Sequence, residues 1–146
     1  MDVADIVLIN QLLARYGHVV DARAWDQFGE LFLDDAEIDY RGVNAPAVLH
    51  GLEAITGYFR DANHPSAHHC TNVYVWEDEQ GAVRAQSKFF VPYTRETHHP
   101  RRWYGGDYED LLERTPDGWR FRLRSCSARW MLTADDGPIV EHRRTW

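Results

Sequence analysis

The chain has 146 residues, of which 13% are aromatic, and its formal net charge is −7. An acidic protein lacks the basic surface that neutralises phosphate groups, so nucleic acids and anionic membranes are excluded as partners. The chain has two cysteines, Cys70 and Cys126, which are too few for a disulfide scaffold and lack the spacing of a metal site. The first residues do not resemble a signal peptide, and no apolar run is long enough to span a membrane.

A single cytoplasmic domain is expected over residues 1–146, and its first part is predicted to be mostly helical. Apolar residues recur at intervals of three and four between Ile6 and Val20, which predicts a helix. The same spacing from Trp25 to Phe32 predicts a second helix, which the acidic pair Asp34-Asp35 ends. A short strand is predicted over 36–41 and a third helix over 52–62.

The second part is predicted to consist of strands. Strands are predicted over 70–77, 82–94, 104–114 and 119–132, and apolar and polar residues alternate in 82–94 and in 119–132. Helices followed by a run of antiparallel strands are typical of the α+β class. We expect three N-terminal helices to cover one face of a curved antiparallel sheet, so that sheet and helices enclose a pocket for a small molecule. The segment 95–102 is expected to be a polar loop, and 134–146 has no clear pattern.

Two groups of residues have the chemistry of a general base. Asp21 stands just after a strongly apolar helical stretch and five residues after Tyr16. A carboxylate there can orient a histidine, or it can simply end one helix and cap the next. His68 and His69 stand at the start of a strand, where side chains alternate, so only one of them can face the interior and the pattern does not say which. A neutral histidine held by a carboxylate is a base at neutral pH, although two such histidines can equally be ordinary surface residues.

Other chemistries have less support in the sequence. Arg124 lies with two further arginines at alternate positions of one strand, which favours a solvated face opposite the acidic strand 107–113. His68, Asp107 and a histidine at position 98 or 99 could bind a metal, but no spacing requires it. There is no Gly-rich phosphate loop, dinucleotide fingerprint or G-x-S-x-G nucleophile motif. We therefore expect neither a metal nor a cofactor.

Three segments together resemble a known family, namely YGHVVDARAWDQFGELFLDDAEIDYRG from Tyr16, HHCTN from His68 and DGWRFRLRS from Asp117. In this order, they resemble the SnoaL-like group of the nuclear transport factor 2-like superfamily, and the resemblance spans Ile6 to Leu132. It implies a cone-shaped α+β fold. The superfamily hosts dehydratases, dehydrohalogenases, isomerases, cyclases, epoxide hydrolases and non-catalytic subunits, so the fold is implied more specifically than the activity.

The resemblance also implies roles for individual residues. Lindane dehydrochlorinases use an Asp–His dyad as base, which corresponds to Asp21 and His68, and bile-acid dehydratases have a Tyr five residues before the Asp, which corresponds to Tyr16. The pocket residues implied in the same way are Tyr40, Phe59, His69, Tyr93, Asp107, Arg124 and Trp130. Two of them depart from the scytalone dehydratase pattern, because Tyr93 replaces an active-site His and Asp107 replaces an active-site Ser. The resemblance thus implies that the Asp–His base is the same as in these relatives, whereas the residues that would assist the leaving group are different.

The resemblance implies a cofactor-independent lyase, most simply a dehydratase, acting on a hydrophobic cyclic, polyketide-like or steroid-like molecule. An isomerase or cyclase would use the same base without a leaving group. A non-catalytic ligand-binding subunit, similar to the β subunits of aromatic-ring dioxygenases, is the alternative from another class. Members of the superfamily form dimers or trimers through the open face of the sheet, so we expect a homo-oligomer, and Arg124 could instead lie at its interface.

Overall fold

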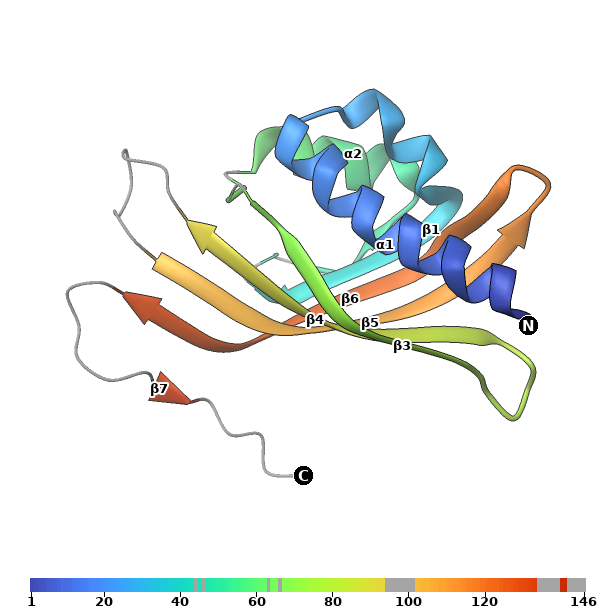
Figure 1. Ribbon diagram of the computed structural model, residues 1–146. Coiled ribbons are helices and arrows are strands. Elements are labelled where there is room, and N and C mark those ends of the chain that lie inside the picture. Colours follow the sequence, from blue (N-terminus) through green and yellow to red (C-terminus); the bar gives the residue numbers. More distant parts are fainter. Residues whose placement is uncertain are drawn as a thin grey trace.

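The computed structural model describes residues 1–43, 45, 47–62, 64–65, 67–93, 102–133 and 140–141. Helices lie across one face of a curved sheet, which we call the inner face (Figure 1). The elements are α1 (Val3–Ala22), the 3₁₀ helix η1 (Trp25–Glu30), β1 (Phe32–Gly42), β2 (Leu49–His50), α2 (Leu52–Asp61), β3 (His69–Glu77), β4 (Val83–Tyr93), β5 (Arg102–Thr115), β6 (Gly118–Thr133) and β7 (Val140–Glu141). The predicted α+β class, with helices first and a curved sheet after them, is confirmed. None of the helices in these ranges has the length and apolar character needed to cross a membrane.

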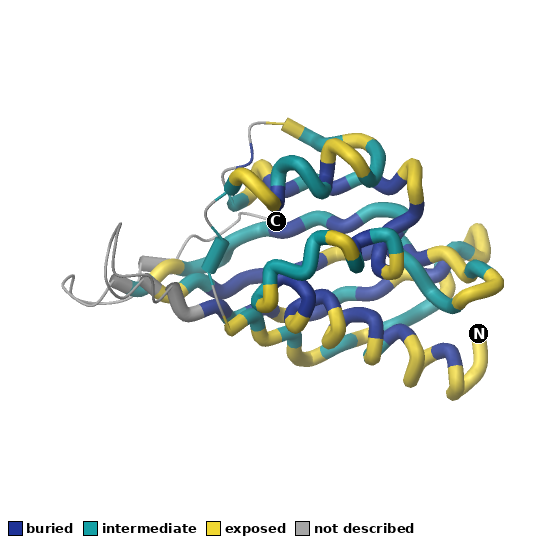
Figure 2. The backbone as a smooth tube through the Cα atoms, turned by 90° about the horizontal axis from the view of Figure 1, so that it is seen from above, coloured by how far each residue is buried: buried dark blue, intermediate teal, exposed yellow. Residues whose placement is uncertain are grey.

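The first helix begins with a capping box. The Asp2 side chain accepts a hydrogen bond from the backbone N–H of Asp5 at 2.9 Å, and the Asp5 carboxylate accepts one from the backbone N–H of Asp2 at 3.1 Å. Asp5 also accepts hydrogen bonds from Arg114 at 2.8 Å and from the Trp119 indole at 3.1 Å, which ties the start of α1 to β5 and β6. One side of α1 is buried on the inner face of the sheet and the other is exposed (Figure 2). The helix predicted from the apolar spacing is confirmed.

The second predicted helix is shorter than expected. It is the 3₁₀ helix η1, and Phe32 already belongs to β1, because this part of the chain pairs with β6. Phe32 lies opposite Phe121, whose N–H donates to the Leu31 carbonyl at 2.8 Å. Asp34 and Asp35 therefore do not end a helix but lie within β1, where the register with β6 shifts.

The strands form one sheet in the order β2-β1-β6-β5-β4-β3, and β7 also pairs with β6. Neighbouring strands are antiparallel except for β1 and β6, which are parallel, so the predicted antiparallel sheet is corrected at this pair. Parallel neighbours require a long connection, and here α2 and four strands separate β1 from β6. The core lies between the inner face and the helices and is unusually rich in aromatic rings.

A bulge in β6 turns Arg124 towards this core. The register between β5 and β6 shifts between Leu111 and Leu112, and Arg122 is the extra residue on β6. An extra residue reverses the alternation of side chains beyond it. Arg124 therefore shares the inner face with Phe121 and is fully buried, whereas Arg122 pairs with acidic residues of β1 and β5 at the surface. The predicted solvated stripe of arginines is wrong for Arg124.

Candidate active site

Asp21 lies in the last turn of α1, where the chain reverses direction. The C-cap residue Arg23 has a left-handed backbone conformation, with φ of 59°, and its side chain donates to the Val20 carbonyl at 2.7 Å. The C-terminal end of a helix carries partial negative charge, so a carboxylate there requires compensating donors.

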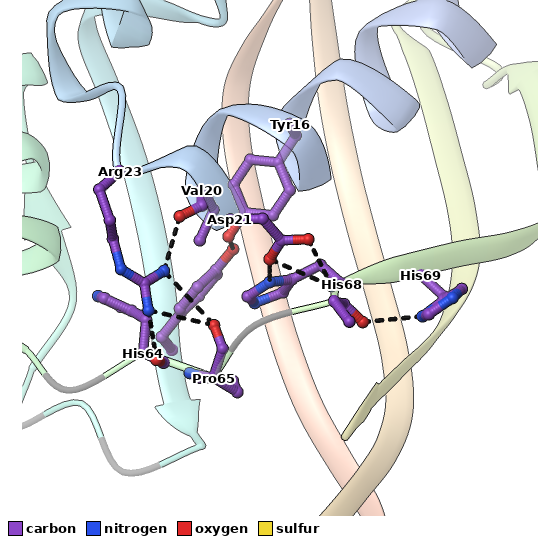
Figure 3. A network of polar contacts seen from close by, with 10 residues as sticks. Tyr16, Val20, Asp21, Arg23, His64, Pro65, His68 and His69 are labelled. Atoms are coloured by element: carbon purple, nitrogen blue, oxygen red, sulfur yellow. Dashed lines mark hydrogen bonds and ion pairs between the residues drawn. The ribbon is translucent and has the colours of Figure 1, made fainter. Parts of the chain in front are cut away.

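His68, 47 residues later in the chain, supplies these donors (Figure 3). Its backbone N–H donates to both Asp21 carboxylate oxygens at 2.9 and 3.2 Å, and its ring Nδ1 lies 2.6 Å from Asp21 Oδ1. Partial burial acts to raise the pKa of Asp21, but the hydrogen bonds and charge of His68 outweigh it and hold that pKa below its ordinary value. An ionised carboxylate only accepts, so Nδ1 carries a proton, and in the neutral form of the ring the lone pair is on Nε2. His68 Nε2 has no hydrogen-bond partner among the described residues.

Two backbone features decide which histidine faces inward. Gly17 of α1 allows β3 to approach, because a Cβ at this position would lie 3.1 Å from the His68 carbonyl oxygen and 3.4 Å from the His68 Cβ. Ala67 adopts a left-handed conformation, with φ of 63°, immediately before His68. The His68 side chain is 10% exposed, whereas His69 is exposed and its ring Nδ1 lies 2.8 Å from the Ala67 carbonyl. The inward histidine is therefore His68.

Tyr16 and Tyr40 form a hydroxyl pair beside the dyad. Their oxygens lie 2.7 Å apart, and the Tyr16 ring stands edge-on to the His68 ring with centroids 6.4 Å apart. Burial raises the pKa of both tyrosines, so both hydroxyls stay protonated at neutral pH. One hydroxyl donates to the other, and the acceptor keeps its own hydrogen for a ligand. The Phe59 ring packs against both tyrosines, with centroid distances of 6.4 and 5.8 Å.

Next to the tyrosines lies a buried ion pair between Arg124 and Asp110. Arg124 Nη1 donates to Asp110 Oδ2 at 3.2 Å, and both side chains are fully buried. The guanidinium stacks on the Tyr16 and Tyr108 rings, 4.2 and 3.8 Å from their centroids. Arg124 Nε and Nη2 and Asp110 Oδ1 have no hydrogen-bond partner in the described part of the chain. Burial raises the pKa of Asp110 to about 7, although the positive charge of Arg124 acts to lower it. Such a carboxyl can exchange a proton near neutral pH.

The structure brings together six of the predicted site residues on the inner side of the sheet. They are Tyr16, Asp21, Tyr40, Phe59, His68 and Arg124. Tyr93 ends β4, but its side chain lies outside the described part of the structure, as do His98 and His99.

The other three predicted pocket residues lie on the opposite, outer face, so their assignment is corrected. His69 is exposed there. Asp107 is bound by Lys88 and Arg129, and it precedes the inward-facing Tyr108, so strand alternation directs it outward. The Trp130 ring occupies the place that a side chain at Gly105 would need, and it packs near Phe90 with a centroid distance of 5.9 Å.

Sequence reasoning misses four residues of this site, namely Arg23, His64, Tyr108 and Asp110. Tyr108 and Asp110 alternate on one face of β5, and this pattern could have identified them. Arg23 and His64 lie outside the strands, where no periodic pattern signals a role. In the described ranges, no group of three or more His, Cys, Asp or Glu side chains could hold a metal ion. The residues present provide a base, protonated hydroxyls and a buried cation, which are the parts of an acid–base site.

Comparisons with known proteins give a family and several structural relatives. A family model for the SnoaL-like domain matches residues 1–125. An uncharacterized protein of Mycobacterium tuberculosis is 27% identical over 128 residues, which cover 84% of each chain. A hexachlorocyclohexane dehydrochlorinase has a TM-score of 0.76 at 16% identity, with 88% of each chain covered. A candidate scytalone dehydratase from Novosphingobium aromaticivorans has a TM-score of 0.78 at 15% identity, covering 98% of this chain and 96% of that one. At these identities, the two solved structures are similar in fold.

Proposed function

Because the chain belongs to the SnoaL-like domain family of the nuclear transport factor 2-like superfamily, we propose that it is a cofactor-independent lyase that removes water from a hydrophobic cyclic molecule. The observation that carries this proposal is the 2.6 Å contact between His68 Nδ1 and Asp21 Oδ1. This contact leaves His68 Nε2 as a base, and such a dyad can take a proton from carbon beside a carbonyl group without a metal. The family and its structural neighbours include lyases that act on small molecules, which supports a lyase reaction for this chain.

In the first step, His68 Nε2 accepts a proton from the carbon next to the carbonyl group of the substrate. The electrons of the C–H bond move into a new C=C bond, and the carbonyl oxygen becomes an enolate oxygen. Asp21 stays ionised and stabilises the imidazolium, which its low pKa supports. The free hydrogen of the Tyr16–Tyr40 pair donates to the enolate oxygen, and the positive charge of Arg124 against the Tyr16 ring favours that charge.

In the second step, the enolate collapses and the bond from the β carbon to its hydroxyl breaks. The departing oxygen takes the proton that the His68 imidazolium holds and leaves as water. The dyad thereby returns to its starting state, and the product is the unsaturated ketone or its aromatic tautomer.

Aromatic rings around the dyad favour a flat or cyclic apolar substrate. The rings of Tyr16, Tyr40, Phe59 and Tyr108 are all buried next to one another. Both structural neighbours quoted above are named for eliminations, one from hexachlorocyclohexane and the other a dehydration. An isomerase or cyclase would use the same base and the same stabilised enolate. Product mass separates these reactions, since only the dehydratase product lacks one water.

The test uses a bicyclic β-hydroxy ketone, a hydroxytetralone, whose dehydration gives a naphthol that absorbs in the ultraviolet. We expect His68→Ala and Asp21→Asn each to lower turnover by roughly 10²–10⁴-fold, the usual contribution of a general base. His69→Ala is the matched control, because it removes the neighbouring histidine on the outer face, and it should retain turnover. Near-normal turnover in both dyad variants would rule the dyad out, and turnover without loss of water would indicate an isomerase or cyclase.

A further inference from the structure

Arg23 connects a second histidine to the turn that carries Asp21. Its guanidinium donates to the backbone carbonyl of His64 at 2.6 Å and reaches the Pro65 carbonyl at 3.4 Å, while the same group binds the Val20 carbonyl (Figure 3). The segment that leads from α2 towards His68 is thus held against the end of α1. Arg23 therefore helps to position both His64 and the turn that carries Asp21.

The His64 ring is fixed by aromatic packing. It stacks face to face on Phe59, with centroids 4.5 Å apart and an interplanar angle of 8°. The rings of Trp25 and Tyr58 lie beside it at 6.0 and 5.9 Å. Phe59 also packs on Tyr16 and Tyr40, so His64 and the pair of tyrosines contact the same ring.

The hydrogen bonds of the ring determine its tautomer. His64 Nε2 is buried and has no hydrogen-bond partner among the described residues. The backbone of Phe59 acts to raise the pKa of His64, which is the effect of a carbonyl group beside the ring, and because Nε2 is unpartnered we infer that this carbonyl faces Nδ1. Phe59 lies in the last turn of α2, where a carbonyl lacks a partner within the helix, and a carbonyl only accepts. Nδ1 consequently carries the proton, and Nε2 presents a lone pair.

This ring also stays neutral at neutral pH. Burial is the main cause that lowers the pKa of His64 to about 4, and the charges of Arg23 and His68 act in the same direction against the raising effect of the Phe59 backbone. His64 Nε2 is therefore a buried acceptor without a donor, near enough to His68 for the two rings to interact electrostatically. An acceptor of this kind is costly to leave unpaired, and it gains a hydrogen bond when a ligand brings a donor.

We propose that His64 is a substrate-binding residue that accepts a hydrogen bond from a hydroxyl group of the ligand through Nε2. This inference rests on the proposed function for the location of the ligand, and it adds that the ligand carries a hydroxyl group other than the one that leaves as water. His68 acts on the reacting carbon, whereas His64 selects for a hydroxyl group.

The test compares the binding of naphthol and methylnaphthalene, which differ in the hydroxyl group and have similar shape. We expect the wild-type protein to bind naphthol about three- to tenfold more tightly than methylnaphthalene, the effect of one hydrogen bond. His64→Phe keeps a ring stacked on Phe59 but removes the acceptor, so the ratio of the two affinities should fall to about one. His64→Gln places an amide oxygen near the position of Nε2 and should restore part of the ratio. His18→Phe, at an exposed position of α1, is the control and should keep the wild-type ratio.

The two affinities are compared within each variant, because a general loss of protein stability weakens the binding of both ligands alike and leaves the ratio of their affinities unchanged. Nitrogen NMR should also show the His64 Nε2 resonance shift when naphthol binds and not when methylnaphthalene binds. A wild-type ratio in His64→Phe, an Nε2 resonance that does not respond to naphthol, or a failure of the wild type to bind naphthol would each overturn the proposal. Binding does not require turnover, so the ratio can also be measured in His68→Ala. If that variant retains turnover while His64→Phe loses the ratio, the assignment of His68 as the base fails and the role of His64 stands.

Discussion

Replacing Asp110 by Asn should change how the stability of the protein depends on pH. The carboxyl group of Asp110 is buried beside Arg124, and its pKa rises from an ordinary 3.8 to about 7 on folding. Between these two pH values, the folded protein holds a proton that the unfolded chain has released. The free energy of unfolding therefore falls as the pH rises through this window.

The size of the effect follows from the pKa shift. At 1.36 kcal/mol for each pKa unit, the rise from 3.8 to about 7 corresponds to about 4 kcal/mol lost between pH 4 and pH 7. Asn does not titrate, so Asp110→Asn lacks this loss. Below pH 7 the Asp110 carboxyl is protonated in the folded protein, so Asn replaces a neutral group there and the charge beside Arg124 does not change.

Urea unfolding of the wild type and of Asp110→Asn between pH 4.5 and pH 8 measures the difference. We expect the free energy of unfolding of the wild type to fall steadily relative to that of Asp110→Asn as the pH rises towards 7. Asp107→Asn is the control: its lysine and arginine partners hold the pKa of Asp107 below the ordinary value against the opposing effect of burial. Its contribution is lost only below about pH 4, so its curve should run parallel to that of the wild type over this range. Parallel curves for Asp110→Asn as well would refute the reasoning.

Three further predictions concern the support of the site and the outer face. Gly17→Ala should lower turnover by an order of magnitude or more, measured with the hydroxytetralone, because the new methyl group would press on the backbone of His68; unchanged turnover would contradict this role. Asp2→Ala removes the cap of α1 and should reduce the free energy of unfolding by about 1 kcal/mol in urea titrations, and an unchanged midpoint would argue against the cap. On the outer face, Trp103 is 43% exposed and packs against Phe90, and we propose that a second copy of the chain covers this face. Sedimentation should then show a dimer or trimer that Trp103→Lys dissociates, whereas a wild-type monomer at micromolar concentration would exclude it.

Local patterns predict most of the elements, because the spacing of apolar residues reflects which side of a helix or strand is buried. The helix from Val3 and the strands from β3 to β6 are found to within about two residues at most of their ends. The start of β1 is missed because Phe32 is held by a parallel partner, Phe121, that lies far along the chain. The spacing of apolar residues around Phe32 cannot reveal a pairing with a strand so far along the chain.

Side-chain direction is less predictable than the elements themselves. The bulge at Arg122 depends on how β6 meets β5, so the inward position of Arg124 is not apparent from alternation alone. The choice between His68 and His69 depends on the left-handed Ala67 and on the close approach of Gly17, and neither is visible in the strand pattern. The resemblance to a family pointed to Asp21 and His68, whose side chains are in contact, whereas its residue-by-residue transfer to Asp107 on β5 was wrong, since that side chain is bound on the other face.

The parallel pairing of β1 with β6 also has a consequence for synthesis on the ribosome. β1 emerges early, but its long neighbour in the sheet is β6, and the Asp5 carboxylate meets Arg114 only 109 residues later. During elongation, the apolar sides of α1 and β1 therefore have no sheet to cover them. We expect the nascent chain to stay open until residues 118–133 have left the exit tunnel, and to depend on chaperones that bind exposed apolar segments until then.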